Sequence, residues 1–247
     1  MRRAVAAGLA GAALACALTA AALAPAEPVA RPAAATEVIG RSVEGRPIRA
    51  TQIGDPAGEH VVLVVGVIHG SEKAGLRIIR RIARSQPSLP GAQLWLISTT
   101  NPDGQRHSQR KNARAVDLNR NFPFRWTPGD KSQGSPFYPG PKPASEPETK
   151  VVMRFVRRIR PDVSVWYHQD WNAVLACRGN PEAGARYAKL AEMRLSCRGN
   201  RLHGTVVSWE QHAIPGAEAF VVELPARVSA GMVGRNANAS IELARNP

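Results

Sequence analysis

The 247-residue sequence contains few cysteines and few aromatic residues: it has three cysteines, and only 5% of its residues are Phe, Trp or Tyr. No two cysteines have the Cys-x-x-Cys spacing, which excludes a structural zinc site built on thiolate pairs. Only one apolar run is long enough to cross a bilayer, so a protein with several membrane spans is excluded. The remaining composition, with 44% hydrophobic and 21% charged residues, is that of a globular protein.

The single long apolar run lies at the N-terminus and has the pattern of an export signal. Residues 1–3 (MRR) are basic, residues 4–23 are apolar, and residues 24–26 (APA) fit a cleavage site. We therefore expect a signal peptide over residues 1–26 and an Ala/Pro linker over residues 27–35, and hence a secreted or extracytoplasmic protein that leaves the membrane after cleavage. An uncleaved anchor is the alternative, because about 20 apolar residues can span a bilayer.

Acidic residues are scarce relative to basic ones. The 33 Lys and Arg against 19 Asp and Glu give a formal net charge of +14. Such a protein is attracted to polyanions, and anionic cell-wall polymers are candidate partners outside the cell. Nucleic acid is not expected, because the basic residues are scattered and no zinc finger or RNA-binding motif accompanies them. A GC-rich genome is an alternative origin of the many arginines. We expect the protein to be a monomer.

Two cysteines remain once the leader is removed. Cys177 and Cys197 form an even pair in an oxidising compartment, which predicts a disulfide. The loop that it would close contributes about 3 kcal/mol of stability through chain entropy. Two buried thiols are the alternative.

Strand-like and helix-like segments alternate along residues 36–247. Apolar runs predict strands at residues 61–68, 94–97, 163–167 and 220–222, after a hairpin at residues 37–53. Helical spacing and caps predict helices at residues 74–83, 145–159 and 183–195 and from about residue 229, with a capping box at residues 145–148. The alternation predicts one α/β domain, with a mixed, mostly parallel twisted sheet and helices on both faces.

Several polar residues lie at the ends of the predicted strands. His69 and Glu72 follow one strand, and His168 follows another. Imidazole nitrogens and carboxylate oxygens suit zinc, and two histidines with one glutamate leave a fourth position open for hydrolysis. Asn101 and Glu223 lie at two further strand ends, and the ligand crevice of an open α/β sheet lies outside such ends. The sequence therefore predicts a single zinc site at this edge.

Motifs spread over nearly the whole mature chain resemble the zinc carboxypeptidase family. They are residues 69–72 (HGSE), 101–104 (NPDG), 110–112 (RKN) and 116–122 (VDLNRNF), then His168 and residues 222–225 (VELP), and residues 40–48 are similar to the N-terminal segment of the family. The resemblance implies the carboxypeptidase A fold. The short chain and the ELP sequence are similar to the bacterial branch that includes murein tripeptide amidase.

The resemblance also implies a role for each matching residue. His69, Glu72 and His168 would bind one zinc ion, Glu223 would be the general base, and Arg110 would stabilise the oxyanion. Asn119 and Arg120 would hold the free C-terminal carboxylate of a peptide substrate, because a guanidinium forks onto a carboxylate.

The same resemblance predicts a specificity pocket and shows two departures. Val207 and Ser208, with Val206 beside them, would line the pocket, and Asp170 or Glu210 is a candidate acidic partner for a basic side chain. The substrate-capping Tyr of the family is missing, because residues 194–207 contain no Tyr, and His203 is the candidate replacement. The second departure is Asp170, which lies two positions after His168, the third ligand, where the family usually has an aromatic or small residue.

The expected function is an exported zinc metallopeptidase. It would hydrolyse an amide bond next to a free C-terminal carboxylate in cell-wall peptides, such as the γ-D-glutamyl–diaminopimelate bond. A general metallocarboxypeptidase acting on protein-derived peptides is the main alternative. Two further hypotheses remain: an N-acyl amino acid deacylase of the desuccinylase type, and a non-catalytic peptide- or wall-binding module.

Overall fold

The computed structural model describes residues 1, 4, 34–129, 134–176, 182–197 and 202–246. Most of the predicted signal peptide, most of the linker and Cys177 lie outside these residues, so cleavage of the leader and the pairing of Cys177 with Cys197 stay predictions. In the part of the chain that the structure describes, no helix is both long enough and apolar enough to span a bilayer.

An eight-stranded mixed sheet forms the centre of the domain, in the order β1-β2-β4-β3-β5-β8-β6-β7. The four strands in the middle, β4, β3, β5 and β8, are parallel to one another, and the pairs β1–β2, β2–β4 and β8–β6 are antiparallel. The strands are β1 (Ala35–Arg41), β2 (Pro47–Gly54), β3 (His60–Val65), β4 (Ala92–Ile97), β5 (Val163–Gln169), β6 (Ala173–Leu175), β7 (Arg194–Ser196) and β8 (Glu218–Leu224). The predicted mixed, mostly parallel sheet is confirmed.

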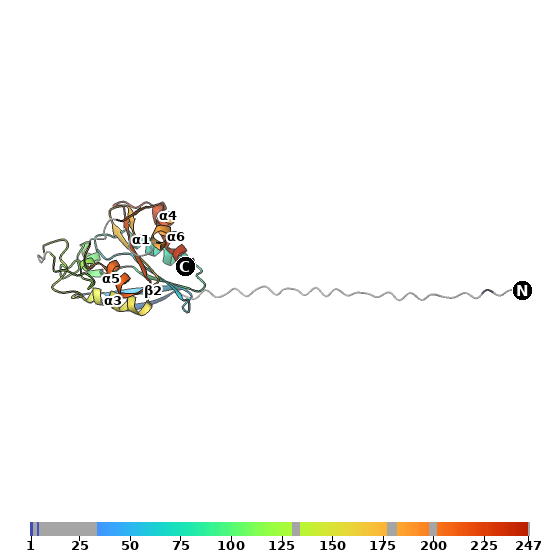
Figure 1. The fold of residues 1–247 in the computed structure, drawn as a ribbon, viewed down its shortest axis with the longest axis horizontal. Coiled ribbons are helices and arrows are strands. Elements are labelled where there is room, and N and C mark those ends of the chain that lie inside the picture. The colour runs from blue at the N-terminus through green and yellow to red at the C-terminus, as the bar shows by residue number, and fades with distance from the viewer. Residues whose placement is uncertain (2–3, 5–33, 130–133, 177–181, 198–201, 247) are drawn as a thin grey trace. The chain divides into compact units, whose positions relative to one another are not determined.

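Helices cover both faces of this sheet, as predicted. Figure 1 shows α1, α4 and α6 grouped on one side, and α3 and α5 on the other. The helices are α1 (Gly75–Ser85), α2 (Pro102–His107), the 3-10 helix η1 (Leu118–Arg120), α3 (Pro147–Ile159), α4 (Glu182–Ala191), α5 (Val206–Ala213) and α6 (Ala230–Arg245).

Strand β3 shows why the central strands have continuous apolar sequences. Val62 and Val64 belong to the core under α1, α4 and α6, whereas Leu63 and Val65 belong to the core under α3 and α5. Successive side chains of a strand point to opposite faces. A strand covered on both faces is therefore apolar at every position.

Three local predictions are corrected by the structure. Residues 66–68 are buried but lie beyond the end of β3. The predicted helix over residues 183–195 ends at Ala191, because Glu192 has a left-handed φ of 54°, and the chain then enters β7. No capping box forms at residues 145–148: Glu146 is the N-cap of α3, and the Ser145 hydroxyl donates to its carboxylate instead of accepting from a backbone N–H of the helix.

Candidate active site

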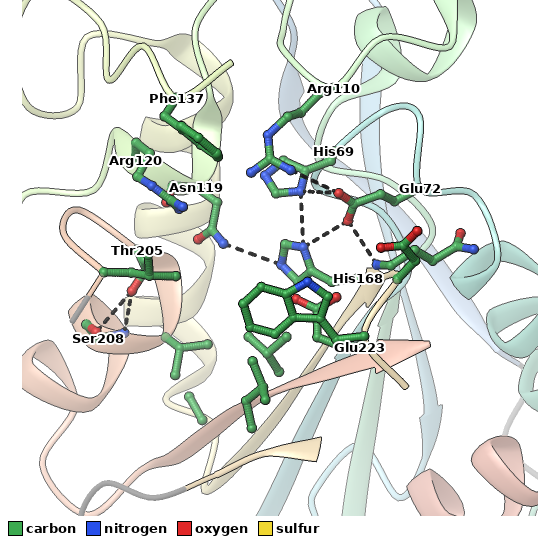
Figure 2. Close-up of a pocket in the computed structure, with 18 of the residues that line it drawn as sticks. His69, Glu72, Arg110, Asn119, Arg120, Phe137, His168, Thr205, Ser208 and Glu223 are labelled. Atoms are coloured by element: carbon green, nitrogen blue, oxygen red, sulfur yellow. Dashed lines mark hydrogen bonds and ion pairs between the residues drawn. The ribbon is translucent and has the colours of Figure 1, made fainter. Parts of the chain in front are cut away.

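Three potential metal ligands meet at the carboxyl ends of β3 and β5. His69 and Glu72 lie in the turn after β3, and His168 is the penultimate residue of β5. Nδ1 of His69 lies 3.1 Å from Nδ1 of His168, and the two Glu72 oxygens lie 2.8 and 3.0 Å from these nitrogens. All three groups converge on one point (Figure 2). Their ligand atoms lie within 4.8 Å of one another, so each can reach one zinc ion at about 2.0–2.2 Å.

A close backbone contact holds the turn that carries His69 and Glu72. A Cβ atom on Gly70 would lie 2.0 Å from the carbonyl carbon of Gly104 in α2, so only glycine fits at position 70. Asn101, the N-cap of α2, accepts from Gly104 N and donates to the carbonyls of Ile68 and Arg110. Asn101 is fully buried and does not line the pocket. Its expected place among the converging polar groups is therefore corrected: it supports the turn from behind.

Buried Asp117 connects the ligands to the neighbouring cations. Its Oδ1 lies 3.0 Å from Nε2 of His69, and its Oδ2 accepts from Nε and Nη2 of Arg110 at 3.1 and 2.9 Å. Burial raises the pKa of Asp117, but His69 and Arg110 lower it more, so the carboxyl stays ionised. A carboxylate behind a ligating histidine fixes the orientation of the ring and strengthens its donor nitrogen.

The protonation of the three groups suits a divalent metal. Burial raises the pKa of Glu72, but hydrogen bonds to His168 and His69 lower it well below its usual range. Burial lowers the pKa of His168 and favours its neutral ring. Burial also lowers the pKa of His69, but Asp117 and Glu72 raise it more. A metal ion would therefore compete with a proton for Nδ1 of His69, the nitrogen that faces Glu72. An ionised carboxylate between two inward-facing imidazoles fits zinc.

Glu223 lies beside the ligands because of strand register. It pairs with His168 across the parallel strands β5 and β8, and both line the same pocket. Its Oε2 is buried without a hydrogen-bond partner among the described residues. Burial, with the nearby Glu72 carboxylate, raises the pKa of Glu223 to about 7. A carboxyl with a pKa near neutrality can both accept and donate a proton during a reaction.

Two arginines lie on another side of the same pocket. Arg110 donates to Oε1 of Glu72 at 3.1 Å, and Arg120 donates to the carbonyl of Asn119 at 2.7 Å. The Asn119 side chain accepts from Val206 N, and its Nδ2 lies 3.4 Å from Nε2 of His168. Asn119 therefore contacts the ligand cluster directly, although it also lines the pocket where a substrate carboxylate was expected.

A single aromatic ring contacts both of these cations. The Phe137 ring centroid lies 5.5 Å from Cζ of Arg110 and 5.4 Å from Cζ of Arg120. Phe137 is half exposed at the edge of the pocket (Figure 2). Its contacts restrain two guanidinium groups that repel each other.

The pocket has a volume of about 410 Å³ and a largely apolar wall. Its lining includes the predicted Val207 and Ser208, and Asp170, Leu175 and Val221 contribute further. Val206 is fully buried and lies behind the wall.

Two other expectations for the pocket are wrong. Glu210 does not line it: this buried carboxylate accepts from the Ser164 hydroxyl and from Nε1 of Trp166. His203 also lies outside, with Nδ1 3.2 Å from the carbonyl of Arg125. No tyrosine lines the pocket within the described residues, and its exposed aromatic side chains are Phe137 and Trp171.

Sequence reasoning missed the double role of Asp117 and the contribution of Phe137. The position of Asp117 in the VDLNRNF motif is a signal that points to it, but its contact with His69 joins residues 48 positions apart. Phe137 lies in an irregular connection, and no spacing in the sequence relates it to either arginine.

Comparisons with known proteins agree with this geometry. The family model described as zinc carboxypeptidase matches residues 30–192. Murein peptide amidase A of Escherichia coli (strain K12) is 31% identical over 189 residues, which cover 70% of this chain and 75% of that protein.

Solved structures give the same fold. The murein-tripeptide amidase MpaA from Escherichia coli O157 superposes with a TM-score of 0.70 and 28% identity, covering 88% of this chain and 94% of that one. Carboxypeptidase A from Helicoverpa armigera superposes with a TM-score of 0.73 and 19% identity, over 85% of this chain and 67% of that one, and supports the fold alone. The chain belongs to the zinc carboxypeptidase family and is a hydrolase of the metallocarboxypeptidase and peptide amidase type.

Proposed function

We propose that this hydrolase is exported and cleaves the amide bond next to a free C-terminal carboxylate in cell-wall peptides. One zinc ion would be held by His69, Glu72 and His168. The observation that carries the proposal is that Arg120 and Glu223 line one pocket with these three ligands. A cation suited to a terminal carboxylate and a carboxyl suited to proton transfer therefore line the same pocket, which supports the proposal.

The chemistry divides between the metal and the chain. Bound zinc would polarise the scissile carbonyl and lower the pKa of water. Glu223 takes the proton of the attacking water and delivers it to the leaving nitrogen, for which a pKa of about 7 is suited. Arg110 donates to the carbonyl oxygen as negative charge develops there. Arg120 binds the terminal carboxylate, and its planar fork favours a free acid over an amide.

Two observations support a peptide with an amino group in its side chain. The carboxylate of Asp170 lines the pocket and can pair with a substrate ammonium, such as that of diaminopimelate in the γ-D-glutamyl–diaminopimelate bond. Similarity to proteins named for murein amidase activity supports the same substrate class. The net charge of +14 would concentrate the enzyme near anionic wall polymers.

A competition between substrates tests the proposal. Purified protein is incubated with a wall tripeptide that contains the γ-D-glutamyl–diaminopimelate bond, with its C-terminally amidated form, with unblocked dipeptides and with N-acyl amino acids, and products are identified by mass spectrometry. We expect fastest hydrolysis of the free-acid tripeptide, loss of activity with a chelator, and recovery with zinc.

Each other outcome contradicts a defined part of the proposal. Equal rates on the acid and the amide would remove the carboxylate-binding role of Arg120. Faster cleavage of ordinary dipeptides or of N-acyl amino acids would assign a general carboxypeptidase or a deacylase. No turnover of any substrate by zinc-loaded protein would leave a binding module. Export is tested separately: the N-terminus of the protein recovered from outside the cytoplasm should be Glu27.

A further inference from the structure

A second cavity, separate from the active site, lies between α1 and α6. It has a volume of about 540 Å³, and none of its lining residues lines the active-site pocket. We call it the arginine groove. Its lining is Arg77, Arg80, Arg81, Arg84 and Ser85 of α1 and Val233, Ala237, Asn238 and Ile241 of α6.

The four arginines of the groove form one exposed face of α1, and no carboxylate among the described residues neutralises their charges. Their spacing of three, four and seven residues places them side by side along the helix, and all four are exposed. None of them forms an ion pair with a carboxylate in the described part of the chain. Like charges at these spacings repel one another and destabilise a helix. A bound anion would relieve this repulsion.

Helix α3 has a second set of arginines with the same spacing, and their contacts can be compared with those of the groove arginines. Arg154, Arg157 and Arg158 repeat the spacing of the first three groove arginines. Arg158 pairs with Glu37, with 3.0 Å between Nη1 and Oε2, and the Arg157 guanidinium lies 5.4 Å from the ring centroid of Trp209. Arg157 and Arg158 thus have side-chain partners within the described residues, and Arg154 has none. Of the groove arginines, Arg77 donates to the carbonyl of Val228 at 2.6 Å, whereas Arg80, Arg81 and Arg84 have no partner in the described part of the chain.

The lining of the groove indicates which anion it fits. Guanidinium groups fork onto phosphate oxygens. No aromatic side chain among the described residues lines the groove, so these residues offer no platform on which bases would stack. The arginine face extends over seven residues, or about 10 Å at the rise of an α-helix, which exceeds the size of a single phosphate. We propose that the arginine groove binds a linear phosphate polymer through its phosphate groups.

Two matched variants of the mature chain test this site. R80Q/R81Q/R84Q removes three charges from the groove, and R154Q/R157Q/R158Q removes three from α3. Binding of inorganic polyphosphate and of a glycerol phosphate polymer is measured by calorimetry at several salt concentrations. We expect the groove variant to bind at least tenfold more weakly, and the α3 variant to change less than threefold. The log–log salt dependence of the groove variant should be less steep by about 2, because three phosphate contacts are lost at roughly 0.7 each.

Folding and catalysis serve as internal controls. Neither variant touches the active-site pocket, so the circular dichroism spectrum and the peptidase activity should match wild type. Tighter binding of the glycerol phosphate polymer than of polyphosphate would support a wall polymer as the source of the phosphates, and the reverse order would support inorganic chains.

Three results would overturn the proposal. Equal losses in both variants would show diffuse attraction by net charge. A loss confined to the α3 variant would move the site to the cavity lined by Arg41, Arg114, Lys150 and Arg154. Tighter, base-dependent binding of an oligonucleotide with the same number of phosphates would exclude recognition through phosphates alone.

Discussion

His168 and Glu223 are register partners on the neighbouring parallel strands β5 and β8. Because the strands run in the same direction and pair in register, the two side chains emerge on the same face next to each other. One strand pairing therefore places the proposed general base beside a proposed metal ligand.

Glu223→Gln should abolish turnover without loss of metal. The amide keeps the shape of the side chain but cannot accept a proton, so kcat should fall by about 100- to 10,000-fold. Zinc per chain, measured by elemental analysis, should equal that of wild type, whereas Glu72→Gln should lower it. Activity of Glu223→Gln within tenfold of wild type would show that another group transfers the proton.

Asp117→Asn should weaken metal binding by about 10- to 100-fold, because His69 loses the carboxylate that orients its ring. Chelator competition measures the affinity. Asp103→Asn is the matched control, since Asp103 is also fully buried but bonds to Ser42 and Arg46 instead of to a proposed ligand. If both variants lost the same affinity, general destabilisation would explain the effect.

Phe137→Ala should lower kcat/KM on free-acid peptides by about fivefold to thirtyfold, because two cation–π contacts of about 0.5–1 kcal/mol each are lost. The rate ratio between free-acid and amidated peptide should fall as well, since Arg120 is less restrained. Phe137→Tyr keeps an aromatic ring at this position, so it should keep both kcat/KM and the rate ratio near their wild-type values. Trp171→Ala, in the same pocket but outside these contacts, should keep the ratio, and a similar fall there would assign the effect to a general loss of apolar surface.

Glu210 should make stability depend on pH. Burial raises its pKa in the folded protein to about 7, from an ordinary value of 4.5. The folded state therefore holds a proton that the unfolded chain releases, and this contribution is complete below pH 4.5 and lost as the pH rises through 7. The total change is about 3 kcal/mol in the free energy of unfolding.

The test compares wild type with Glu210→Gln by urea unfolding from pH 4 to 8. Wild type should lose stability relative to the variant across this window, because glutamine has no charge to bury. Parallel curves for wild type and Glu210→Gln would show that Glu210 has a normal pKa in the folded protein.

The sequence was most informative where burial is complete. The apolar runs of β3 and β5 predicted strands covered on both faces, and the position of His168 near a strand end predicted that it would meet His69. These inferences succeed because burial on two faces and the shared edge of parallel strands are strong constraints.

Other features depend on contacts that no local pattern encodes. Strands β6 and β7 have three residues each, too few to show any alternation. The sequence predicted the strand end at which Asn101 lies. It did not predict that the Asn101 amide donates to the carbonyls of Ile68 and Arg110 instead of facing the pocket. Glu210 was a candidate pocket acid by its position near Ser208, yet α5 turns it into the core beneath Trp166.

The two exposed aromatic side chains of the pocket, Phe137 and Trp171, lie in connections outside regular secondary structure, whereas His168 and Glu223 lie within strands. Connections tolerate exchange far better than buried strands do. Evolution, or a protein engineer, can therefore alter substrate preference in these connections while His168 and Glu223 on the strands stay unaltered.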